Sequence, residues 1–148
     1  MIKVCGIVGF LDKTKNKETL IKKMAIKLTH RGPDDEGYYC DDFIALGHRR
    51  LAIIDLKTGE QPIYNENKHL VIIFNGEIYN YAELRTELQS LNHIFTTSSD
   101  TEVIIHGYEE YGVNILKKLR GMFAFAIWDK KEKMLFCARD PFGIKPFY

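Results

Sequence analysis

A cysteine stands near the start of the chain, at the edge of a short apolar run, in the sequence "VCGIVGF". A nucleophilic thiol needs an approachable backbone, a nearby base and hydrogen-bond donors for a developing oxyanion. Gly6 leaves the backbone beside Cys5 open. The alternative interpretation is a small core cysteine in a buried strand, a common location for this residue type. No histidine signature of a papain-like protease accompanies Cys5, so its base must come from elsewhere or from the chain terminus itself.

The dipeptide Asn75-Gly76 follows an apolar run and supports two interpretations. Asn-Gly between apolar segments is the strongest short signal for a type I′ hairpin turn. Alternatively, the Asn75 side-chain amide and the Gly76 N–H are two donors for an oxyanion. Glu77 follows at once and the next segment turns helical at Asn80, which weakens the hairpin interpretation. Both remain open at this stage.

Charged residues at two further places could bind charged groups of a ligand. Arg49 and Arg50 precede an apolar segment, and a planar guanidinium can bind a carboxylate through two hydrogen bonds. Adjacent residues of a strand point to opposite faces, so only one of these arginines can serve a pocket. Asp100 lies at a predicted helix start, where it either caps the helix or binds an ammonium group. A solvated arginine pair and a capping aspartate are the simpler alternatives.

The sequence predicts neither a metal site nor a nucleotide site in this chain. No two histidines have HExxH or another ligand spacing. The segment "GIKPF" lacks the spacing of a phosphate-binding loop. The five histidines are His30, His48, His69, His93 and His106.

The apolar patterns predict strands that cluster along the chain and do not alternate with helices. Such clustering favours an α+β architecture with antiparallel sheets, layered with helices outside two stacked sheets. One helix is expected to bury Leu20, Met24 and Leu28, and two others to begin with capping boxes, Asn80 to Glu83 and Ser99 to Glu102. Strands are predicted at 4–12 and 69–76, with one or two more within 43–55 and a hairpin formed by 121–129 and 133–140. Helices are predicted at 18–28, 80–91 and 99–112, and a loop at 29–37.

Composition limits the classes of protein further. The 148 residues form one domain, and the net charge of +1 argues against nucleic acid or an anionic membrane as the main partner. No apolar run approaches the length of a membrane helix, and Asp12 and Lys13 end the first run too early for a signal peptide. Three cysteines without paired spacing indicate reduced thiols, so we expect a cytoplasmic protein.

The motifs as an ordered set resemble a known family. Together they are similar to the glutaminase domain of glutamine-hydrolysing asparagine synthetases, which are class II amidotransferases of the N-terminal-nucleophile (Ntn) hydrolase superfamily. The resemblance extends from Cys5 to Tyr148 and implies a four-layer αββα sandwich of two antiparallel sheets. The motifs are "CGIVGF", "HRGPDDEG", "GHRRLAIID", "QPIYN", "FNGEIYNYAELRTEL", "SDTEVI", "LRGMFAFAIWD" and "ARDPFGIKPFY".

The resemblance implies a role for each matched residue in hydrolysing L-glutamine. Cys5 would attack the side-chain amide, while Asn75 and Gly76 would stabilise the oxyanion. Arg50 would bind the α-carboxylate of glutamine, and Glu77 and Asp100 its α-ammonium group. The pocket would be lined by the backbone of Arg50, Leu51, Ala52, Ile53 and Ile54.

The resemblance also implies that the nucleophilic cysteine is the first residue of the mature chain, with its own α-amine as general base. An α-amine has a pKa of about 8, whereas a peptide nitrogen cannot accept the proton. We therefore expect Met1–Val4 to be absent from the active form, either because translation starts at the Val4 codon and the initiator residue is removed, or because a short propeptide is cleaved. A non-catalytic glutamine-binding module is the alternative.

A synthetase domain of the same polypeptide is expected downstream, with ATP and Mg as its cofactors and none in this domain. The partners expected are L-glutamine and that synthetase domain, and a homodimer is compatible with the resemblance. Other class II amidotransferases, which make phosphoribosylamine or glucosamine phosphate, and asparagine synthetase-like proteins of other pathways remain alternatives for the whole protein.

Overall fold

The protein is described from a computed structural model that covers residues 5–13, 15–51 and 59–148. In chain order its elements are β1 Gly6–Leu11, α1 Lys17–Ile26, β2 Asp35–Cys40, β3 Ile44–Arg50, β4 Ile63–Tyr64, β5 Leu70–Ile78, α2 Tyr81–Ser90, α3 Thr101–Tyr111, a 3₁₀ helix Gly112–Lys117, β6 Gly121–Asp129 and β7 Met134–Arg139.

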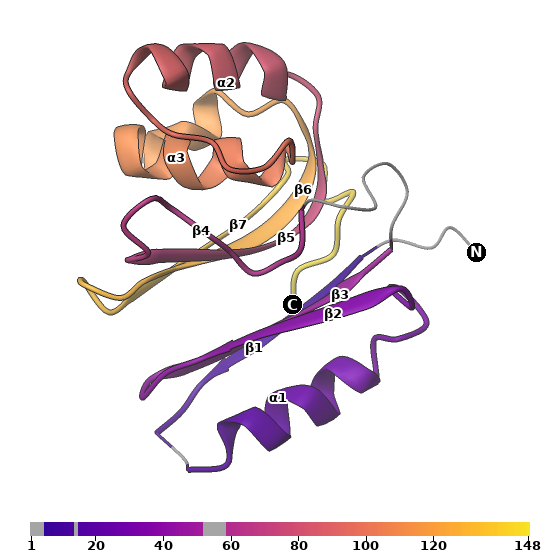
Figure 1. The fold of residues 1–148 in the computed structure, drawn as a ribbon. Helices are drawn as coiled ribbons and strands as arrows, with labels where there is room; N and C mark the ends of the chain where they lie inside the picture. Colours follow the sequence, from indigo (N-terminus) through magenta and orange to yellow (C-terminus); the bar gives the residue numbers. More distant parts are fainter. Residues whose placement is uncertain (1–4, 14, 52–58) are drawn as a thin grey trace.

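Two antiparallel sheets form the centre of the molecule (Figure 1). Sheet A has the strand order β1-β3-β2, and sheet B the order β4-β5-β6-β7. Helix α1 covers the outer face of sheet A, and α2 and α3 cover the outer face of sheet B. The predicted α+β class and the αββα layering are therefore confirmed.

Two hydrophobic clusters hold these layers together, and strand β5 contributes to both. Side chains on one face of β5, Ile72 and Phe74 among them, pack under α2 and α3. Those on the other face, Val71 and Ile73, pack between the sheets with Leu46 of β3. Because β5 is covered on both faces, its sequence is a continuous apolar run, as expected for a central strand. Asn75 belongs to the face that points toward sheet A.

The buried face of α1 differs from the predicted one. Ile21 and Ala25 are fully buried, whereas Leu20 of the predicted stripe is 43% exposed. The two faces differ by one position, which is a rotation of about 100° around the helix. Apolar residues occur on several sides of this helix, so periodicity alone could not choose between them. Packing against Gly47 of β3 selects Ile21.

The predicted capping boxes do not form. The Asn80 side chain donates to the Lys118 carbonyl and accepts from the Arg120 N–H, and makes no capping hydrogen bond to α2. Ser99 Oγ does accept from the Thr101 N–H at the start of α3. Glu102, however, accepts hydrogen bonds from Thr96 and Thr97 in the preceding connection.

The remaining predictions of secondary structure vary in accuracy. The hairpin of β6 and β7 and the two helices α2 and α3 are confirmed within one or two residues at each end. Strand β2 was missed because its first residues, Asp35 to Gly37, fall in the segment predicted as a loop. Strand β4 has only two residues, too few for a periodic signal. No helix in the described part of the chain has the length and apolarity that crossing a bilayer requires.

Candidate active site

Cys5 lies directly before β1, at the end of sheet A where β3 also ends. Its Sγ accepts a hydrogen bond from the Leu51 N–H at 3.4 Å and lies 3.9 Å from the Leu51 carbonyl oxygen. The thiol is half-buried and forms no disulfide. Cys5 is thus held by backbone groups at a strand end, and is not packed within the apolar core.

Arg31, which the sequence analysis did not select, contacts the same residue. Its Nε donates to the Cys5 carbonyl oxygen at 3.2 Å. The motif "HRGPDDEG" contains Arg31, so the signal was present, but nothing in a loop sequence shows which residue a long side chain will reach. Arg31 therefore places a fixed positive charge beside the Cys5 backbone.

Strand β5 runs without interruption through Asn75 and Gly76, so the hairpin interpretation of this dipeptide is wrong. Asn75 pairs with Ala124 and Gly76 with Phe123 of β6. A Cβ on Gly76 would lie 2.7 Å from the Phe123 Cα and closer still to the Met122 carbonyl oxygen. Glycine is required here because β6 approaches closely, not because the chain turns.

The backbone N–H groups of alternate residues in β5 point away from β6. The Phe74 N–H donates to Gln61 Oε1 at 2.6 Å, and the Ile78 N–H donates to Asp100 Oδ2 at 2.8 Å. In an antiparallel ladder every second residue of a strand directs its N–H to the same edge. Gly76 lies midway between Phe74 and Ile78, so its N–H points to this edge as well. Strand β4 pairs only with Val71 and Ile72, so this edge of β5 has no neighbouring strand beside Gly76 in the described part of the chain. The Gly76 N–H is therefore placed for a ligand.

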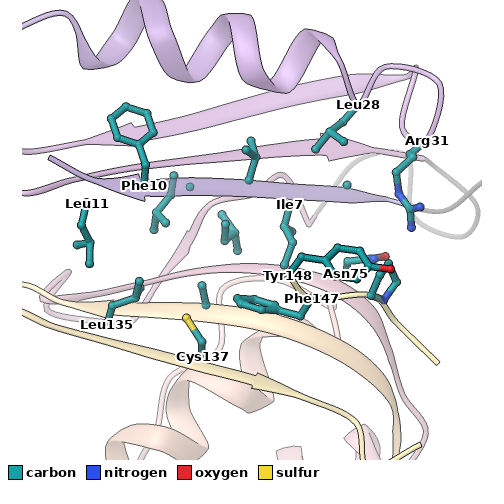
Figure 2. Close-up of a pocket in the computed structure, with 17 residues that line it drawn as sticks. Ile7, Phe10, Leu11, Leu28, Arg31, Asn75, Leu135, Cys137, Phe147 and Tyr148 are labelled. Carbon is teal, nitrogen blue, oxygen red and sulfur yellow. The ribbon is translucent and has the colours of Figure 1, made fainter. Parts of the chain in front are cut away.

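Asn75 is 3% exposed and borders a cavity of about 450 Å³ between the two sheets (Figure 2). Gly6, the residue after Cys5, and Arg31 border the same cavity. Figure 2 shows Asn75 beside Phe147 and Tyr148. Most of the remaining lining is apolar and comes from β1 and β7. The polar groups of the cavity therefore gather at the end where β1 begins.

Asp100 and Glu77 lie close enough to interact electrostatically. Burial raises the pKa of the Asp100 carboxyl, and the neighbouring Glu77 charge raises it further. The hydrogen bond from the Ile78 N–H acts in the opposite direction. Asp100 makes no capping hydrogen bond to α3, so the capping interpretation of this residue is not supported. Two adjacent carboxylates, one of them mostly buried, favour a bound cation.

The two arginines of β3 have different surroundings, as the alternation of side chains along a strand predicts. Arg49 is buried, donates through Nε to the Gly32 carbonyl at 2.9 Å and pairs with Glu36 of β2. Arg50, at the end of β3, reaches toward α3. A Cβ built on Gly59 would lie 3.4 Å from Ser99 Cβ and 3.8 Å from Arg50 Nη2. Arg50 therefore lies near the residue that precedes Asp100.

The last residues of the sequence fold back toward Cys5. Asp140 accepts four backbone hydrogen bonds, from Phe123, Phe142, Ile144 and Lys145. Lys145 is 7% exposed. Burial lowers the pKa of its ammonium group, and Cys5 is near enough to act in the opposite direction. Lys145 was missed because neither interpretation of its segment, as a phosphate loop or as part of the motif "ARDPFGIKPFY", assigned the lysine a role.

Of the predicted pocket backbone, Leu51 contacts Cys5, whereas Ala52, Ile53 and Ile54 lie outside the described residues. The structure brings Cys5 and Leu51 together at one end of sheet A and Glu77 and Asp100 together beside β5. Asn75 borders the cavity that reaches Gly6.

Comparison with known proteins identifies the family. The sequence model described as "Glutamine amidotransferase domain" matches residues 4–148. Asparagine synthetase [glutamine-hydrolyzing] 1 of Bacillus subtilis (strain 168) is 51% identical over 150 residues, covering 98% of this chain and 24% of that protein. Asparagine synthetase [glutamine-hydrolyzing] 2 of Oryza sativa subsp. japonica is 47% identical over 148 residues, covering 98% and 25%.

A solved structure shows the same fold. Glutamine phosphoribosylpyrophosphate amidotransferase from B. subtilis, complexed with ADP and GMP, matches with a TM-score of 0.56 and 32% identity, over 70% of this chain and 24% of that one. Its Ntn-hydrolase amidotransferase fold agrees with the sandwich described above. The chain spans about a quarter of the length of the curated relatives. On the family match and these identities, the chain belongs to the glutamine amidotransferase domain family.

Proposed function

We propose that this domain hydrolyses L-glutamine to glutamate and ammonia, with Cys5 as nucleophile. Family membership over residues 4–148 supports the reaction class. The observation that carries the residue assignment is the course of β5. Its unbroken strand places a buried Asn75 amide on the cavity and turns the Gly76 N–H to an open edge. Two such donors are what a tetrahedral oxyanion requires.

In this mechanism the Cys5 thiolate attacks the side-chain amide carbon of glutamine. The carbonyl oxygen becomes an oxyanion, which Asn75 and Gly76 stabilise. The C–N bond then breaks, and the leaving nitrogen takes up the proton that the thiol lost and departs as ammonia. A thioester now joins Cys5 to the glutamyl group. Water attacks the thioester, releases glutamate and restores the thiol.

The charged groups of the site match the two ends of free glutamine. Arg50 binds the α-carboxylate, and Glu77 with Asp100 binds the α-ammonium group. A peptide-bound glutamine lacks both charges and could not form these two ion pairs, so the site favours the free amino acid. The Leu51 backbone, whose N–H contacts Cys5 Sγ, forms part of the pocket wall in this proposal.

The α-amine of Cys5 serves as general base in this proposal, through a water. Its pKa of about 8 allows it to accept the thiol proton near neutral pH, which a peptide nitrogen cannot do. The active form therefore begins at Cys5. Asparagine is the product we propose for the whole protein, by ATP- and Mg-dependent amidation of aspartate in a synthetase domain; this is supported by the names of relatives that are about four times as long.

The test compares glutamate release by three forms of the protein. One begins at Cys5, one retains Met1–Val4, and the third begins with alanine in place of Cys5. We expect turnover only in the first. Equal activity in the first two would refute the role of the α-amine. Equal, negligible activity in all three would refute glutamine hydrolysis by this domain and favour a non-catalytic module.

The acceptor is tested separately, with the protein extended to the full length of its relatives. Asparagine formed from aspartate, ATP and glutamine supports the proposed product. Glutamine hydrolysis without asparagine formation would assign the domain to another amidotransferase.

A further inference from the structure

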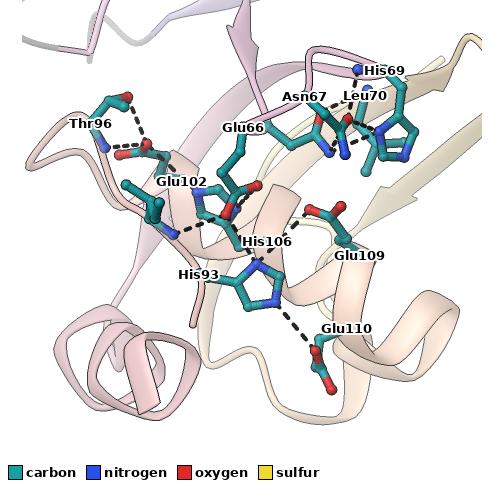
Figure 3. A network of polar contacts seen from close by, with 12 residues as sticks. Glu66, Asn67, His69, Leu70, His93, Thr96, Glu102, His106, Glu109 and Glu110 are labelled. Carbon is teal, nitrogen blue, oxygen red and sulfur yellow. Dashed lines mark hydrogen bonds and ion pairs between the residues drawn. The ribbon is translucent and has the colours of Figure 1, made fainter. Parts of the chain in front are cut away.

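Four potential metal ligands meet on the outer layer of the molecule, away from the cavity between the sheets (Figure 3). Glu66 comes from the connection between β4 and β5, and His93 from the connection between α2 and α3. His106 and Glu109 come from successive turns of α3. One nitrogen or oxygen atom from each of the four residues lies within 4.8 Å of all the others.

The buried ring of His106 is the observation that points to a ligand. His106 is 1% exposed, and neither of its ring nitrogens makes a hydrogen bond within the described residues. Its Nδ1 lies 3.3 Å from Glu66 Oε2, and its Nε2 lies 3.7 Å from Glu102 Oε1. A buried polar atom without a partner destabilises the folded state, so such an atom in a folded protein calls for an explanation.

Glu102 does not supply the missing hydrogen bond. Its two carboxylate oxygens already accept from the backbone N–H and side-chain hydroxyl of both Thr96 and Thr97, at 2.7–2.9 Å. Glu102 therefore faces the Nε2 side of the His106 ring at 3.7 Å, while Nδ1 faces the cluster through Glu66. A carboxylate behind the second ring nitrogen is the usual surrounding of a metal-binding histidine.

His93 has the same arrangement. Its Nδ1 lies 3.3 Å from Glu66 Oε1 and 3.9 Å from Glu109 Oε2, inside the cluster. Its Nε2 lies 3.3 Å from Glu110 Oε2, outside the cluster. Both imidazoles thus direct Nδ1 inward and Nε2 toward an outer carboxylate.

We propose that Glu66, His93, His106 and Glu109 form a structural Zn²⁺ site. Tetrahedral zinc holds nitrogen and oxygen ligands at about 2.0–2.2 Å, which places neighbouring ligand atoms about 3.3–3.6 Å apart. The distances from Glu66 to His106 and to His93, both 3.3 Å, and from Glu109 to His93, 3.9 Å, are close to that range. Glu66 and Glu109 are exposed, so small rotations of their side chains can close the wider gaps.

Charge and coordination number favour zinc over a hard cation. Two neutral imidazoles and two carboxylates form an N₂O₂ set, whereas Ca²⁺ and Mg²⁺ prefer oxygen ligands alone. Four protein ligands leave no open position, which is typical of a structural site and not of a catalytic one. The ion would join the β4–β5 connection and the α2–α3 connection to helix α3, whose first turn follows Asp100.

Zinc binding tests the proposal, measured by competition with a chromophoric chelator after alkylation of the three thiols with iodoacetamide. We expect one Zn²⁺ per chain, a higher Tm with zinc, and an intense visible spectrum with Co²⁺ as a tetrahedral probe. Replacing a residue that only hydrogen-bonds to a metal ligand typically weakens metal binding roughly 10- to 100-fold, and replacing a ligand itself should weaken it more. Glu109→Gln and His93→Asn should therefore weaken zinc binding at least about 100-fold.

Glu132→Gln is the matched control because Glu132 is exposed and lies in the turn between β6 and β7. It changes the net charge as Glu109→Gln does and should leave zinc affinity unchanged. Glu109 is on the surface, so its variant should fold even if a variant at the buried His106 does not. Equal zinc affinity in the Glu109 and Glu132 variants, or no zinc binding by the alkylated protein, overturns the proposal and leaves an ion-pair cluster.

Discussion

Asp140 offers a sharp test of how the chain holds its last residues against the active site. Oδ1 of Asp140 accepts hydrogen bonds from the N–H groups of Phe142 and Ile144, at 3.1 and 2.9 Å. Oδ2 accepts from the N–H groups of Phe123 and Lys145, at 3.2 and 3.0 Å. Each carboxylate oxygen therefore serves two donors. The substitution Asp140→Asn replaces one oxygen with an NH₂ group, which cannot accept.

The magnitude follows from the two donors that lose their acceptor. An unsatisfied buried donor costs about 1–3 kcal/mol, and two of them about 2–6 kcal/mol. The asparagine will direct its NH₂ group toward Phe142 and Ile144, whose hydrogen bonds are the more exposed pair. We therefore expect Asp140→Asn to lower the free energy of unfolding by about 2–4 kcal/mol, measured by urea denaturation at pH 7.

Asp129 provides the matched control. It is also mostly buried, but a single oxygen, Oδ1, accepts both the Lys131 and Glu132 N–H groups in the turn between β6 and β7. An asparagine keeps one acceptor oxygen, so Asp129→Asn should cost less than about 1 kcal/mol. Equal losses of stability for the two variants, or a loss below about 0.5 kcal/mol for Asp140→Asn, would refute the claim that two backbone donors lose their acceptor oxygen in Asp140→Asn.

The Asp140 carboxylate should also make the stability of the protein depend on pH. Burial alone would raise the pKa of Asp140, but the four backbone N–H groups outweigh burial and lower it below the ordinary value. A carboxyl with a depressed pKa in the folded state binds its proton more tightly in the unfolded state. Its contribution is therefore complete above pH 5 or so and is lost as pH falls below about 4. The difference in stability between the unmodified protein and Asp140→Asn should shrink over that acidic range.

Three further substitutions test the strand β5 and its surroundings. Gly76→Ala should lower the free energy of unfolding by about 3 kcal/mol or more, seen in urea denaturation, because its Cβ would overlap the backbone of β6. Asn75→Ala, in the form beginning at Cys5, should lower kcat for glutamate release by about 100- to 1,000-fold while the circular dichroism spectrum stays unchanged. Arg50→Lys should raise KM for glutamine with kcat nearly constant, since a lysine cannot bind a carboxylate through two parallel hydrogen bonds. An unchanged value in any of these assays contradicts the corresponding assignment.

The elements that could be predicted from sequence are those with long apolar patterns. Strands β5 and β6 are long apolar runs with mostly buried residues, and helices α2 and α3 bury apolar residues at helical spacing. Strand β2 begins with two acidic residues and is only partly buried, so no apolar pattern shows where it starts. Helix α1 has apolar residues on several sides, and only contact with β3 determines which of them is buried.

The candidate site could be predicted only in part. The ordered set of motifs selected Cys5, Asn75 and Gly76 as candidates, whereas their residue types alone supported simpler interpretations at least as well. Arg31 and Lys145 were missed because their relation to Cys5 depends on how two distant loops return to the start of β1. Those contacts are tertiary, and no local pattern records them.

The histidine and glutamate cluster was missed for a related reason. Its members come from three segments, and only His106 and Glu109 have a helical spacing, which by itself is too common to indicate a metal site. The packing of two connections against α3 brings the other two residues to them. A search for ligand spacing along a sequence therefore cannot find a site of this kind.

The Asn75-Gly76 dipeptide shows why local propensity failed at the most informative position. A glycine within a strand weakens the strand, so its presence there usually reflects a turn, a bulge or a close approach of another chain segment. Here the cause is the approach of β6. The same glycine directs its N–H to the edge of β5 that faces away from β6, between the hydrogen bonds of Phe74 and Ile78. Packing and chemistry therefore depend on one residue, and a loss of activity in Gly76→Ala identifies a lost donor only if stability is measured on the same sample.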